Sequence, residues 1–399
     1  MNILCVSRYF KGADFLKAIK EEGHTAYLIT SSKLDKEPWP WEAIQETFYM
    51  VEDEEGCWNM PDLINGLAYI MRRLKFDIMV SLDDFDVEAA AHLREYFRVN
   101  GMGETTARYF RDKLAMRIKA RSEGIPVPDF TSLFHDEDIN RFTDTVEAPW
   151  ILKPRGQASA TGMSKVYSKE ELWEKLTALG DRRHAFLLEK FTPGDVYHVD
   201  ALSFNGKVVF SKVSQYLNTP FEVAHGGGIF RSCTLAVNSW EDQKLKLLNE
   251  TIMKAFGMVF SASHTEFIKG QDGKYYFLET SSRVGGAHLS DMVEKATGIN
   301  LWTEWAKIEI AAHTGGKYKL PKAKDDYAGI IVSLSRYEHP DTSSFKDPEI
   351  VWHLNKKHHI GMIVASPNHE RVMELLNQYA DRIKNEFHAS LPAPDRPTN

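Results

Sequence analysis

The sequence is poor in cysteine, and its three cysteines, Cys5, Cys57 and Cys233, lie far apart in a chain of 399 residues. None forms a Cys-x-x-Cys pair, so neither a disulfide framework nor a structural zinc site is expected, and a reducing cytoplasm is the expected location. No apolar run approaches the roughly 18 residues needed to span a bilayer, so no membrane partner is expected. Residues 1–7 lack the long apolar segment of a signal peptide and are predicted to form a first strand.

Basic residues are also in the minority: 49 Lys and Arg residues stand against 56 Asp and Glu residues, which gives a formal net charge of -7. Binding to a phosphate backbone needs a basic surface, so no nucleic-acid partner is expected. Hydrophobic residues make up 43% of the chain and charged residues 26%, as in ordinary globular proteins. A length of 399 residues exceeds one hydrophobic core, so two to four domains are expected.

Strands and helices alternate in the first 100 residues. Such alternation indicates a parallel, Rossmann-like sheet. Residues 7–12, the first turn after a strand, have no Gly-x-Gly-x-x-Gly pattern, so a dinucleotide-binding site is poorly supported. Asp83, Asp84 and Asp86 follow the third strand, where they either contact a ligand or cap the next helix. The predicted elements are strands at 3–7, 25–30 and 76–82 and helices at 14–22, 61–73 and 87–97.

The remaining chain is predicted to be mixed α+β. A helix is expected at 105–122, ended by Gly124, and residues 146–300 are rich in strands. The dipeptides at 205–206 (Asn-Gly) and 272–273 (Asp-Gly) lie between apolar runs and are typical of β-hairpin turns. Further predicted elements are a loop at 220–228, strands at 329–334 and 361–365, a helix at 370–387 and a disordered tail at 391–399.

Two glutamates, Glu266 and Glu279, flank the predicted hairpin turn at 272–273. Neighbouring strands have a register that points both carboxylates to one face. Two carboxylates held together repel each other unless a cation lies between them, and Mg²⁺ prefers oxygen ligands. Arg283 brings a planar cation suited to phosphate or carboxylate. The alternative is an ordinary cross-strand surface on which Arg283 balances the charge of the glutamates.

A loop of small residues follows Lys153, which ends a predicted buried strand. Gly156, Ser159, Thr161 and Gly162 let the backbone approach phosphate oxygens closely, and successive N–H groups in such a loop bind anions. Lys153 would add a point charge on the phosphates. No Gly-Lys-Ser/Thr follows, so this is not a Walker loop. The alternative is a flexible hairpin tip.

A third segment, residues 186–194, predicts a strand that ends at Glu189, Lys190 and Phe191 and then turns. A strand end of this kind presents a carboxylate and exposed backbone to the edge of an adenine ring. The alternative is a plain strand, turn and strand without a ligand.

In this order the segments resemble the ATP-grasp superfamily over nearly the full length, roughly residues 1–390. The greatest likeness is to a group of L-amino-acid ligases, carnosine-synthase-like enzymes and biotin-carboxylase-like proteins. The resemblance rests on four motifs. Residues 111–113 (Arg-Asp-Lys) and 124–128 (Gly-Ile-Pro-Val-Pro) resemble the first ATP lysine and the turn after it, and residues 151–154 resemble the strand of the second ATP lysine. Residues 188–191 resemble the adenine hinge, and Glu266, Glu279 and Arg283 match the metal carboxylates and the arginine of Glu-x-Asn-x-Arg.

The resemblance implies an α/β and α+β chain with the ATP-grasp fold. Its expected parts are a Rossmann-like N-terminal domain at 1–104, a central subdomain at 105–188, a catalytic subdomain at 189–312, a lid subdomain at 313–390 and the tail at 391–399.

The resemblance also implies which residues bind ATP and metal. Metal binding falls to Glu266, Glu279 and Ser281, with one or two Mg²⁺ ions and Mn²⁺ as a substitute, and catalysis to Arg283 and Lys153. Ser281 stands where the family usually has asparagine, and Val196 stands where many members have a ribose-binding glutamate, so Asp195 or His198 takes that role or no residue does. The ATP contacts implied are Lys113, Lys153, Arg155, Gly156, Ser159, Thr161, Gly162, Glu189, Lys190, Phe191, Asp195, His198, Lys212 and Leu278.

The implied activity is a carboxylate–amine ligase that activates its acid as an acyl phosphate and forms an amide, with amino acids as expected substrates and a homodimer as a possible assembly. One alternative is an enzyme of the biotin-carboxylase type, which activates bicarbonate; another is a nucleotide-binding regulator without catalysis. The expected substrate contacts are Tyr216, His225, Gly226, Gly227, Arg283, Gly285, Gly286 and His288.

Overall fold

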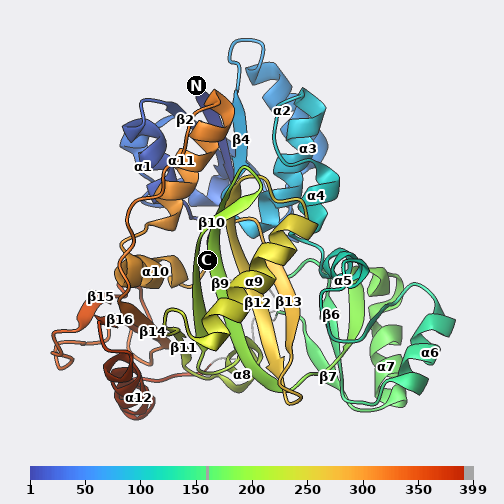
Figure 1. Ribbon diagram of the computed structural model, residues 1–399. Helices are drawn as coiled ribbons and strands as arrows, with labels where there is room; N and C mark the ends of the chain where they lie inside the picture. Colours follow the sequence, from blue (N-terminus) through green and yellow to red (C-terminus); the bar gives the residue numbers. More distant parts are fainter. Residues whose placement is uncertain (159–160, 391–399) are drawn as a thin grey trace.

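The computed structural model describes residues 1–158 and 161–390, apart from the side chains of residues 224 and 225. Its first sheet has the strand order β3-β2-β1-β4, and every pairing in it is parallel (Figure 1). The Rossmann-like sheet expected from the sequence is therefore confirmed, although β3 was not predicted. The elements are β1 (Asn2–Ser7), α1 (Ala13–Glu21), β2 (Thr25–Ser31), η1 (Ser32–Leu34), η2 (Trp41–Ala43), β3 (Ile44–Met50), α2 (Met60–Ile70), β4 (Ile78–Ser81), η3 (Asp84–Asp86) and α3 (Val87–Phe97).

Both faces of this sheet are covered, as a parallel sheet requires. Helices α2 and α3 pack on one face, and α1 packs on the other together with α11 (Leu301–Thr314). The rings of Phe15 and Trp305 meet there with centroids 4.9 Å apart. A helix from residues 301–314 thus belongs to the core of the first sheet.

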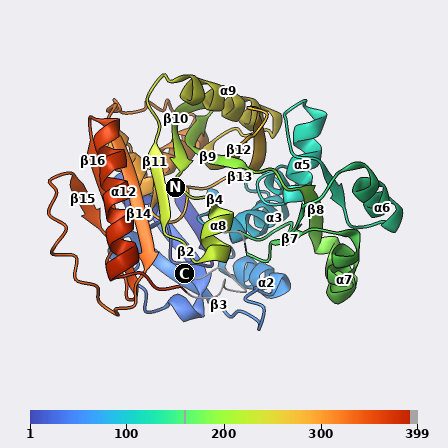
Figure 2. The ribbon, with the colours of Figure 1, turned by 90° about the horizontal axis from the view of Figure 1, so that it is seen from below.

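The second sheet is small and antiparallel, with the order β5-β8-β6-β7. Two helices cover one face, and Figure 2 shows this unit standing to one side of the molecule. The elements are α4 (Glu104–Arg108), α5 (Lys113–Ser122), β5 (Phe130–Ser132), α6 (Asp136–Thr145), β6 (Trp150–Pro154), β7 (Ser164–Val166), α7 (Lys169–Leu179), η4 (Gly180–Ala185) and β8 (Phe186–Lys190).

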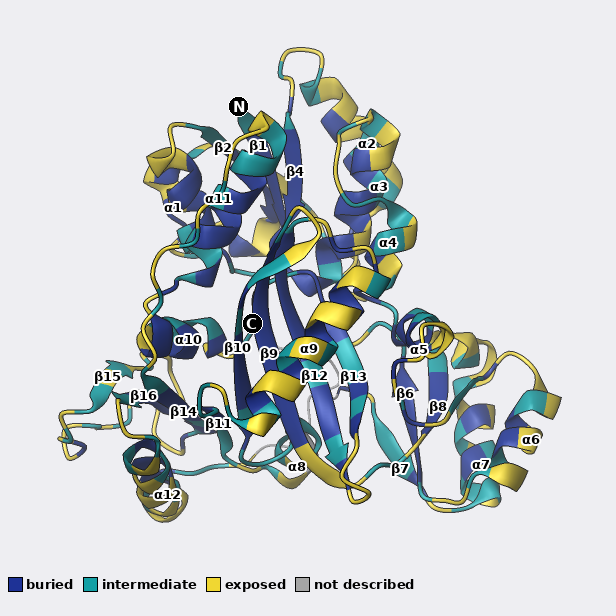
Figure 3. Cartoon of the chain, viewed as in Figure 1, coloured by how far each residue is buried: buried dark blue, intermediate teal, exposed yellow. Residues whose placement is uncertain are grey.

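The third sheet has eight strands in the order β13-β12-β9-β10-β11-β14-β16-β15, all antiparallel. Helix α9 lies over β9 and β10, and α12 lies along β14 and β16 (Figure 2). Figure 3 shows the strands buried beneath helices whose outer faces are exposed. The elements are β9 (Gly194–Phe204), β10 (Lys207–Tyr216), α8 (Pro220–Gly226), β11 (Phe230–Thr234), α9 (Trp240–Ala255), β12 (Ser261–Gly270), β13 (Tyr275–Ser281), α10 (Leu289–Thr297), β14 (Tyr327–Leu334), β15 (Ile350–His353), β16 (His359–Ser366) and α12 (His369–Glu386).

Strands β14, β15 and β16 continue the same sheet as β9 to β13, because β11 pairs with β14. The residues after 313 therefore share a sheet with those before it. The domain divisions at residues 104, 188 and 312 stay predictions, and the tail at 391–399 lies outside the described residues. Both predicted hairpins are present, β9 with β10 and β12 with β13.

Two predictions of secondary structure were wrong. The helix expected at 105–122 is divided into α4 and α5, because Asp112 adopts an extended backbone (φ -95°, ψ 109°) and caps the second helix. The loop expected at 220–228 contains α8, which Thr219 and Glu222 start with a reciprocal capping box and Pro220 favours in the first turn. No helix of the described residues is long and apolar enough to cross a membrane.

Candidate active site

Helix α5 lies between the small and the large sheet (Figure 1). Asp112 caps it by accepting hydrogen bonds from the backbone N–H groups of Leu114 and Ala115. The cap sets Lys113 in the first turn, where its Nζ atom lies 2.6 Å from the carbonyl oxygen of Gln157 and 2.6 Å from Glu279 Oε2. Lys113 therefore joins the loop after β6 to strand β13.

Arg117, one turn further along α5, makes a second link between the two sheets. Its side chain is fully buried, its Nε atom lies 2.5 Å from Glu189 Oε2 on β8, and its Nη1 atom donates to the carbonyl oxygen of Leu278 on β13. Sequence reasoning missed Arg117. The signal was its spacing of four residues from Lys113, which puts both side chains on one face of a helix.

Lys153 and Glu189 form a buried ion pair between the neighbouring strands β6 and β8. Lys153 Nζ lies 2.7 Å from Glu189 Oε1, and each residue is only 4% exposed. Burial lowers the pKa of Lys153 to about 8, because the ammonium loses its water and Glu189 offsets that loss only in part. Burial raises the pKa of Glu189, but the opposing charges of Arg117 and Lys153 outweigh burial and leave this pKa below its ordinary value.

Strands β12 and β13 pair so that Glu266 lies directly opposite Glu279, which confirms the register expected from the sequence. Carboxylates in such positions have Cβ atoms about 5 Å apart and repel each other. Burial raises the pKa of Glu279, but the ammonium of Lys113 outweighs burial and lowers the pKa to about 2. Among the described backbone and side chains, which leave out the side chains of residues 224 and 225, neither Glu266 Oε2 nor Glu279 Oε1 has a hydrogen-bond partner. Two carboxylates with open oxygens at directly paired positions of neighbouring strands fit a hard divalent cation such as Mg²⁺.

Two side chains, Tyr216 and His264, contact the carboxylate of Glu266. The hydroxyl group of Tyr216 donates to Glu266 Oε1 at 2.9 Å, and His264 Nε2 lies 3.5 Å from the same oxygen. His264 Nδ1 lies 2.8 Å from Asp200 Oδ1. Burial lowers the pKa of His264, but Asp200 and Glu266 outweigh burial and raise the pKa to about 9. Tyr216, expected to contact substrate, thus contacts a candidate metal ligand.

His198, Asp200 and His264 are close enough to one another to hold a metal ion, with ligand atoms within 4.8 Å. Their contacts are those of a hydrogen-bond network instead. Each Asp200 oxygen pairs with one imidazole, at 2.7 Å from His198 and 2.8 Å from His264, and His198 Nε2 lies 2.8 Å from Ser232 Oγ. Gly285 packs against Asp200 and His264, since a Cβ atom at Gly285 would lie 2.7 Å from Asp200 Oδ1. His198 is fully buried with both ring nitrogens engaged, so its expected contact with ribose finds no support.

Arg283 lies against the first sheet. Its Nη2 atom is 3.7 Å from Asp84 Oδ2, its Nη1 atom donates to the carbonyl oxygen of Val284 at 2.9 Å, and its Nε atom is buried without a hydrogen-bond partner among the described residues. Arg111 Nη1 lies 3.5 Å from the same Asp84 oxygen. A Cβ atom on Gly156 would lie 3.8 Å from Arg111 Nη2, so Arg111 connects the loop after β6 with the first sheet.

The loop after β6 contains four further residues that were expected to contact ATP, and their surroundings differ. Arg155, expected to contact ATP, is paired with Asp112 at 3.0 Å through Nε, and its Nη1 atom donates to the carbonyl oxygen of His184. Thr161 is buried. Gly162 has a φ of +69°, and a Cβ atom there would lie 2.9 Å from Pro154 Cγ, so glycine is required. Ser159 lies outside the described residues.

The backbone at the candidate adenine hinge is already hydrogen-bonded. The N–H group of Lys190 donates to the Asp129 carbonyl oxygen at 2.8 Å, and that of Phe191 donates to Pro149 at 3.0 Å. The ammonium of Lys165 lies 3.7 Å from the centroid of the Phe191 ring. An adenine that used these N–H groups would have to displace the bonds to Asp129 and Pro149.

Three predicted ATP or substrate residues lie apart from this cluster. Asp195 belongs to the other face of β9 from His198 and Asp200, because side chains alternate along a strand and Asp195 shares its face with Tyr197. Lys212 lines a separate cavity of about 360 Å³. His288 pairs with Asp291 at 2.9 Å and packs on Trp352, with ring centroids 4.6 Å apart.

The remaining predicted residues lie near the ends of elements. Gly226 ends α8, and Gly227 follows it with a φ of +63°. The side chain of His225 lies outside the description. Gly286 is open, since no described atom would lie within 4 Å of a Cβ atom there. Ser281 is buried on β13 and shares a strand face with Glu279, two residues earlier.

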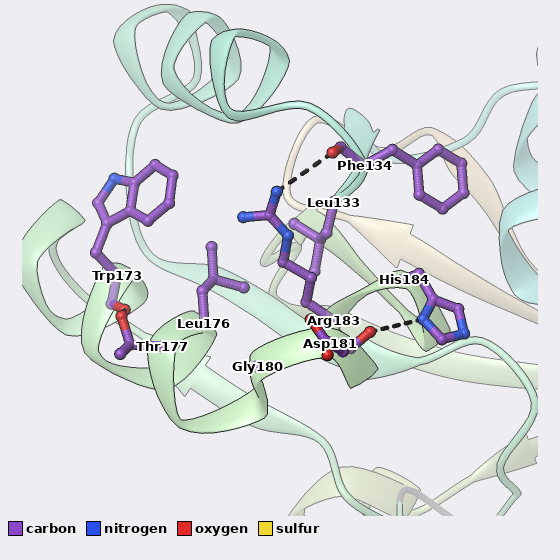
Figure 4. A pocket seen from close by; sticks show the side chains of 9 residues that line it. All are labelled: Leu133, Phe134, Trp173, Leu176, Thr177, Gly180, Asp181, Arg183 and His184. Atoms are coloured by element: carbon purple, nitrogen blue, oxygen red, sulfur yellow. Dashed lines mark hydrogen bonds between the residues drawn. The ribbon is translucent and has the colours of Figure 1, made fainter.

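A further cavity of about 500 Å³ lies in the unit of the small sheet (Figure 4). The side chain of Arg183 crosses it and donates to the carbonyl oxygen of Phe134 at 3.3 Å, and the ring of His184 bonds the Asp181 carbonyl oxygen at 2.8 Å. None of the candidate active-site residues lines this cavity.

The chain resembles known proteins in sequence and in fold. It is 28% identical over 268 residues to the L-arginine-specific L-amino acid ligase of Bacillus subtilis, an alignment covering 66% of this chain and 64% of that ligase. It superposes on the crystal structure of an L-amino acid ligase from Bacillus licheniformis with a TM-score of 0.74, at 18% identity, over 97% of this chain and 98% of the other. The biotin carboxylase domain of the Hydrogenobacter thermophilus 2-oxoglutarate carboxylase, solved with MgADP and bicarbonate, gives a TM-score of 0.71 at 15% identity over 97% and 91% of the two chains.

The fold and the relatives indicate the class: the chain has the ATP-grasp fold, and the relatives that it resembles in sequence and structure are ATP-grasp proteins. Within that class, its named relatives in sequence are ligases that form carbon–nitrogen bonds. No protein-family model matches the chain. The aligned region spans less than two thirds of the Bacillus subtilis ligase, so the activity of this chain is treated below as a proposal.

Proposed function

We propose that this protein is an ATP- and Mg²⁺-dependent carboxylate–amine ligase. It would activate a carboxylate as an acyl phosphate, which an amine attacks to give an amide, ADP and phosphate. The supporting observation is the double link made by α5: Lys113 reaches Glu279 and Arg117 reaches Glu189, so α5 brings together residues from three distant segments of the chain. Lys113 and Lys153 supply cations for a triphosphate, and Glu266 and Glu279, paired on neighbouring strands, suit its metal ion.

On this proposal Lys113 and Lys153 hold the ATP phosphates. Both ammonium groups are paired with carboxylates in the structure, Lys113 with Glu279 and Lys153 with Glu189. Phosphate oxygens would replace the carboxylates as partners of these ammonium groups. Glu189 would then accept a hydrogen bond from the adenine amino group, while Arg117 holds Glu189 in place. Phe191 and Leu278 would flank the base.

Glu266, Glu279 and the hydroxyl of Ser281 would hold the metal, as one or two Mg²⁺ ions for which Mn²⁺ substitutes. Bound Mg²⁺ supplies neutralisation of phosphate charge. The chain's own contribution is to fix both carboxylates: Tyr216 holds Glu266, and Lys113 holds Glu279. Lys113 also lowers the pKa of Glu279, so this ligand is ionised at neutral pH.

Arg283 would bind the transferred phosphoryl group and the oxyanion of the tetrahedral intermediate. The distance from its Nη2 atom to Asp84 Oδ2 is 3.7 Å, which is longer than in a close ion pair. The guanidinium is therefore free to pair with an anionic substrate. Catalysis of this kind rests on position and charge, and we assign no protein nucleophile.

The relatives support amino acids as the acid and the amine, since one relative is an L-arginine-specific L-amino acid ligase. The free thiols Cys5, Cys57 and Cys233 are consistent with a reducing cytoplasm. A homodimer is a further proposal, supported by the dimer named for the Hydrogenobacter biotin carboxylase domain.

The direct test is a screen for phosphate and ADP release with MgATP and pairs of L-amino acids, in which each pair is compared with its single members. We expect one or more pairs to stimulate release and to yield a dipeptide detected by mass spectrometry. The Glu279→Gln variant is the matched control and should give no stimulated release. Release that no acid and amine pair stimulates would contradict the proposal.

A second candidate is an enzyme that phosphorylates bicarbonate, because the neighbour solved with MgADP and bicarbonate has a TM-score of 0.71. Stimulation of ADP release by bicarbonate with biotin, and not by amino acids, would favour it. A regulator without catalysis is the third candidate, motivated by Ser281 and Val196. It predicts ATP binding, no phosphate release with any mixture, and unchanged biological function in Glu279→Gln.

A further inference from the structure

Lys212 on β10 is a buried cation that the proposed mechanism does not use. It is only 4% exposed, and its ammonium has no hydrogen-bond or ion-pair partner within residues 1–158 and 161–390. The contact described for it is the ring of Tyr327, whose centroid lies 5.7 Å from Nζ. A buried ammonium without a partner is costly, so either the chain tolerates this cost or an anion satisfies it.

Nearby carboxylates do not provide that partner. Burial lowers the pKa of Lys212, and the charges of Asp242 and Asp325 offset that effect only in part. Asp242 is already paired with Lys246, whose Nζ atom lies 2.8 Å from it. The ammonium of Lys212 therefore has no carboxylate within ion-pair distance among the described residues, although Asp242 and Asp325 lie near enough to act on its charge.

Lys212 lines a cavity of about 360 Å³, together with Lys246, Lys324, Glu250 and Asp325. One wall is the outer edge of β10, the edge away from β9. Strand β11 pairs only with residues 214–216 of β10, and the carbonyl oxygen of Val213 accepts from Leu235.

Earlier residues of β10 have no strand on this side among the described parts of the chain. Backbone groups alternate along a strand, so Ser211, two residues before Val213, directs its N–H and C=O groups to the same edge, and Ser211 lines the cavity. A backbone donor and a buried ammonium in one cavity form the usual protein side of an anion site.

We propose that this cavity binds a small oxyanion, either a carboxylate or a phosphate group, whose oxygen pairs with Lys212 and with the open edge of β10. The site is separate from the cluster formed by Lys113, Lys153 and Glu279, none of which lines this cavity. The proposal does not depend on the ligase activity proposed above.

The test is binding of two probes, acetate and inorganic phosphate, to the full chain by isothermal titration calorimetry and by ¹³C NMR of reductively methylated lysines. Phosphate also suits the cluster of Lys113 and Lys153, so the titrations are repeated with Lys153→Met, which should keep the Lys212 site. We expect saturable binding of at least one probe and a shift of the Lys212 methyl signal. The probe that binds distinguishes a carboxylate ligand from a phosphate ligand.

The variant Lys212→Met should weaken probe binding by about tenfold or more, because a charge-assisted hydrogen bond is lost. Without a probe it should melt no lower than the wild type, since it removes an unpaired buried charge. Lys207→Met, an exposed lysine on the same strand, is the control for net charge and should bind like the wild type. Equal binding by Lys212→Met and wild type, or no shift of the Lys212 signal with either probe, would overturn the proposal.

Discussion

Replacing Arg117 with methionine tests the link between the two sheets. Arg117 is fully buried and contacts Glu189 at 2.5 Å and the carbonyl oxygen of Leu278. Methionine keeps the apolar volume and removes both contacts. Removing one partner of a buried ion pair costs about 3–5 kcal/mol, because the other charge is left uncompensated. Lys153 remains 2.7 Å from Glu189, so we expect a loss near the lower limit, about 3 kcal/mol in the free energy of unfolding.

The pH dependence of the free energy of unfolding provides a second, independent test of this link. The pKa of Glu189 is lowered in the folded protein, so its ionised form adds stability above the unfolded value of about 4.3. That stability is lost as the pH falls through the folded pKa. In Arg117→Met the lowering is weaker, so less stability is lost on the acid side than in the wild type.

Urea denaturation followed by tryptophan fluorescence, at neutral pH and in steps below pH 5, measures both effects. Arg121→Met is the matched control: Arg121 lies on the same helix, its side chain is 51% exposed, and its ion pair with Asp129 is 3.9 Å long. We expect the control to lose about 1 kcal/mol or less. If Arg117→Met lost no more than Arg121→Met, the proposed link between the sheets would be refuted.

Three further predictions concern the candidate site. Glu279→Gln should abolish turnover while ATP still binds without metal, because one carboxylate of the metal site is lost; steady-state ADP release and calorimetry check this, and unchanged turnover would exclude a metal role. ATP affinity should decrease as the pH rises through about 8, the pKa to which burial lowers Lys153, because the neutral amine cannot pair with phosphate; Lys153→Arg should remove this dependence, and the same profile in both proteins would contradict the role of Lys153. Tyr216→Phe should raise the Mg²⁺ concentration needed for half-maximal activity by about fivefold, since a hydrogen bond that orients Glu266 is worth about 1 kcal/mol. His264→Gln should act in the same direction, and unchanged metal dependence in both variants would show that the network is structural only.

The sequence was sufficient where local patterns determine structure. Alternating apolar runs predicted the parallel sheet, and Asp-Gly at 272–273 predicted the hairpin that places Glu266 opposite Glu279. Local rules also existed for two features that were missed. Thr219 with Glu222 matches a capping box, and Asp112 before Lys113 is a helix start that divides the predicted helix.

Other features could not be derived from local patterns, because they join residues far apart in sequence. Arg117 meets Glu189, 72 residues later, and Leu278, 161 residues later. His264 meets Asp200 across 64 residues. The cavity lined by Lys212 is a further example, because it lies beside the part of β10 that β11 does not reach, and such strand pairing is set by contacts between distant segments.

The central claim is that Lys153 and Glu279, from different sheets, act on one bound triphosphate. Calorimetric titration of ATP into wild type, Lys153→Met and Glu279→Gln, each with and without Mg²⁺, tests it most directly. The account predicts that Lys153→Met weakens ATP binding in both conditions, whereas Glu279→Gln removes only the gain in affinity that Mg²⁺ brings to the wild type. Wild-type affinities in Lys153→Met, or a full Mg²⁺ effect in Glu279→Gln, would contradict it.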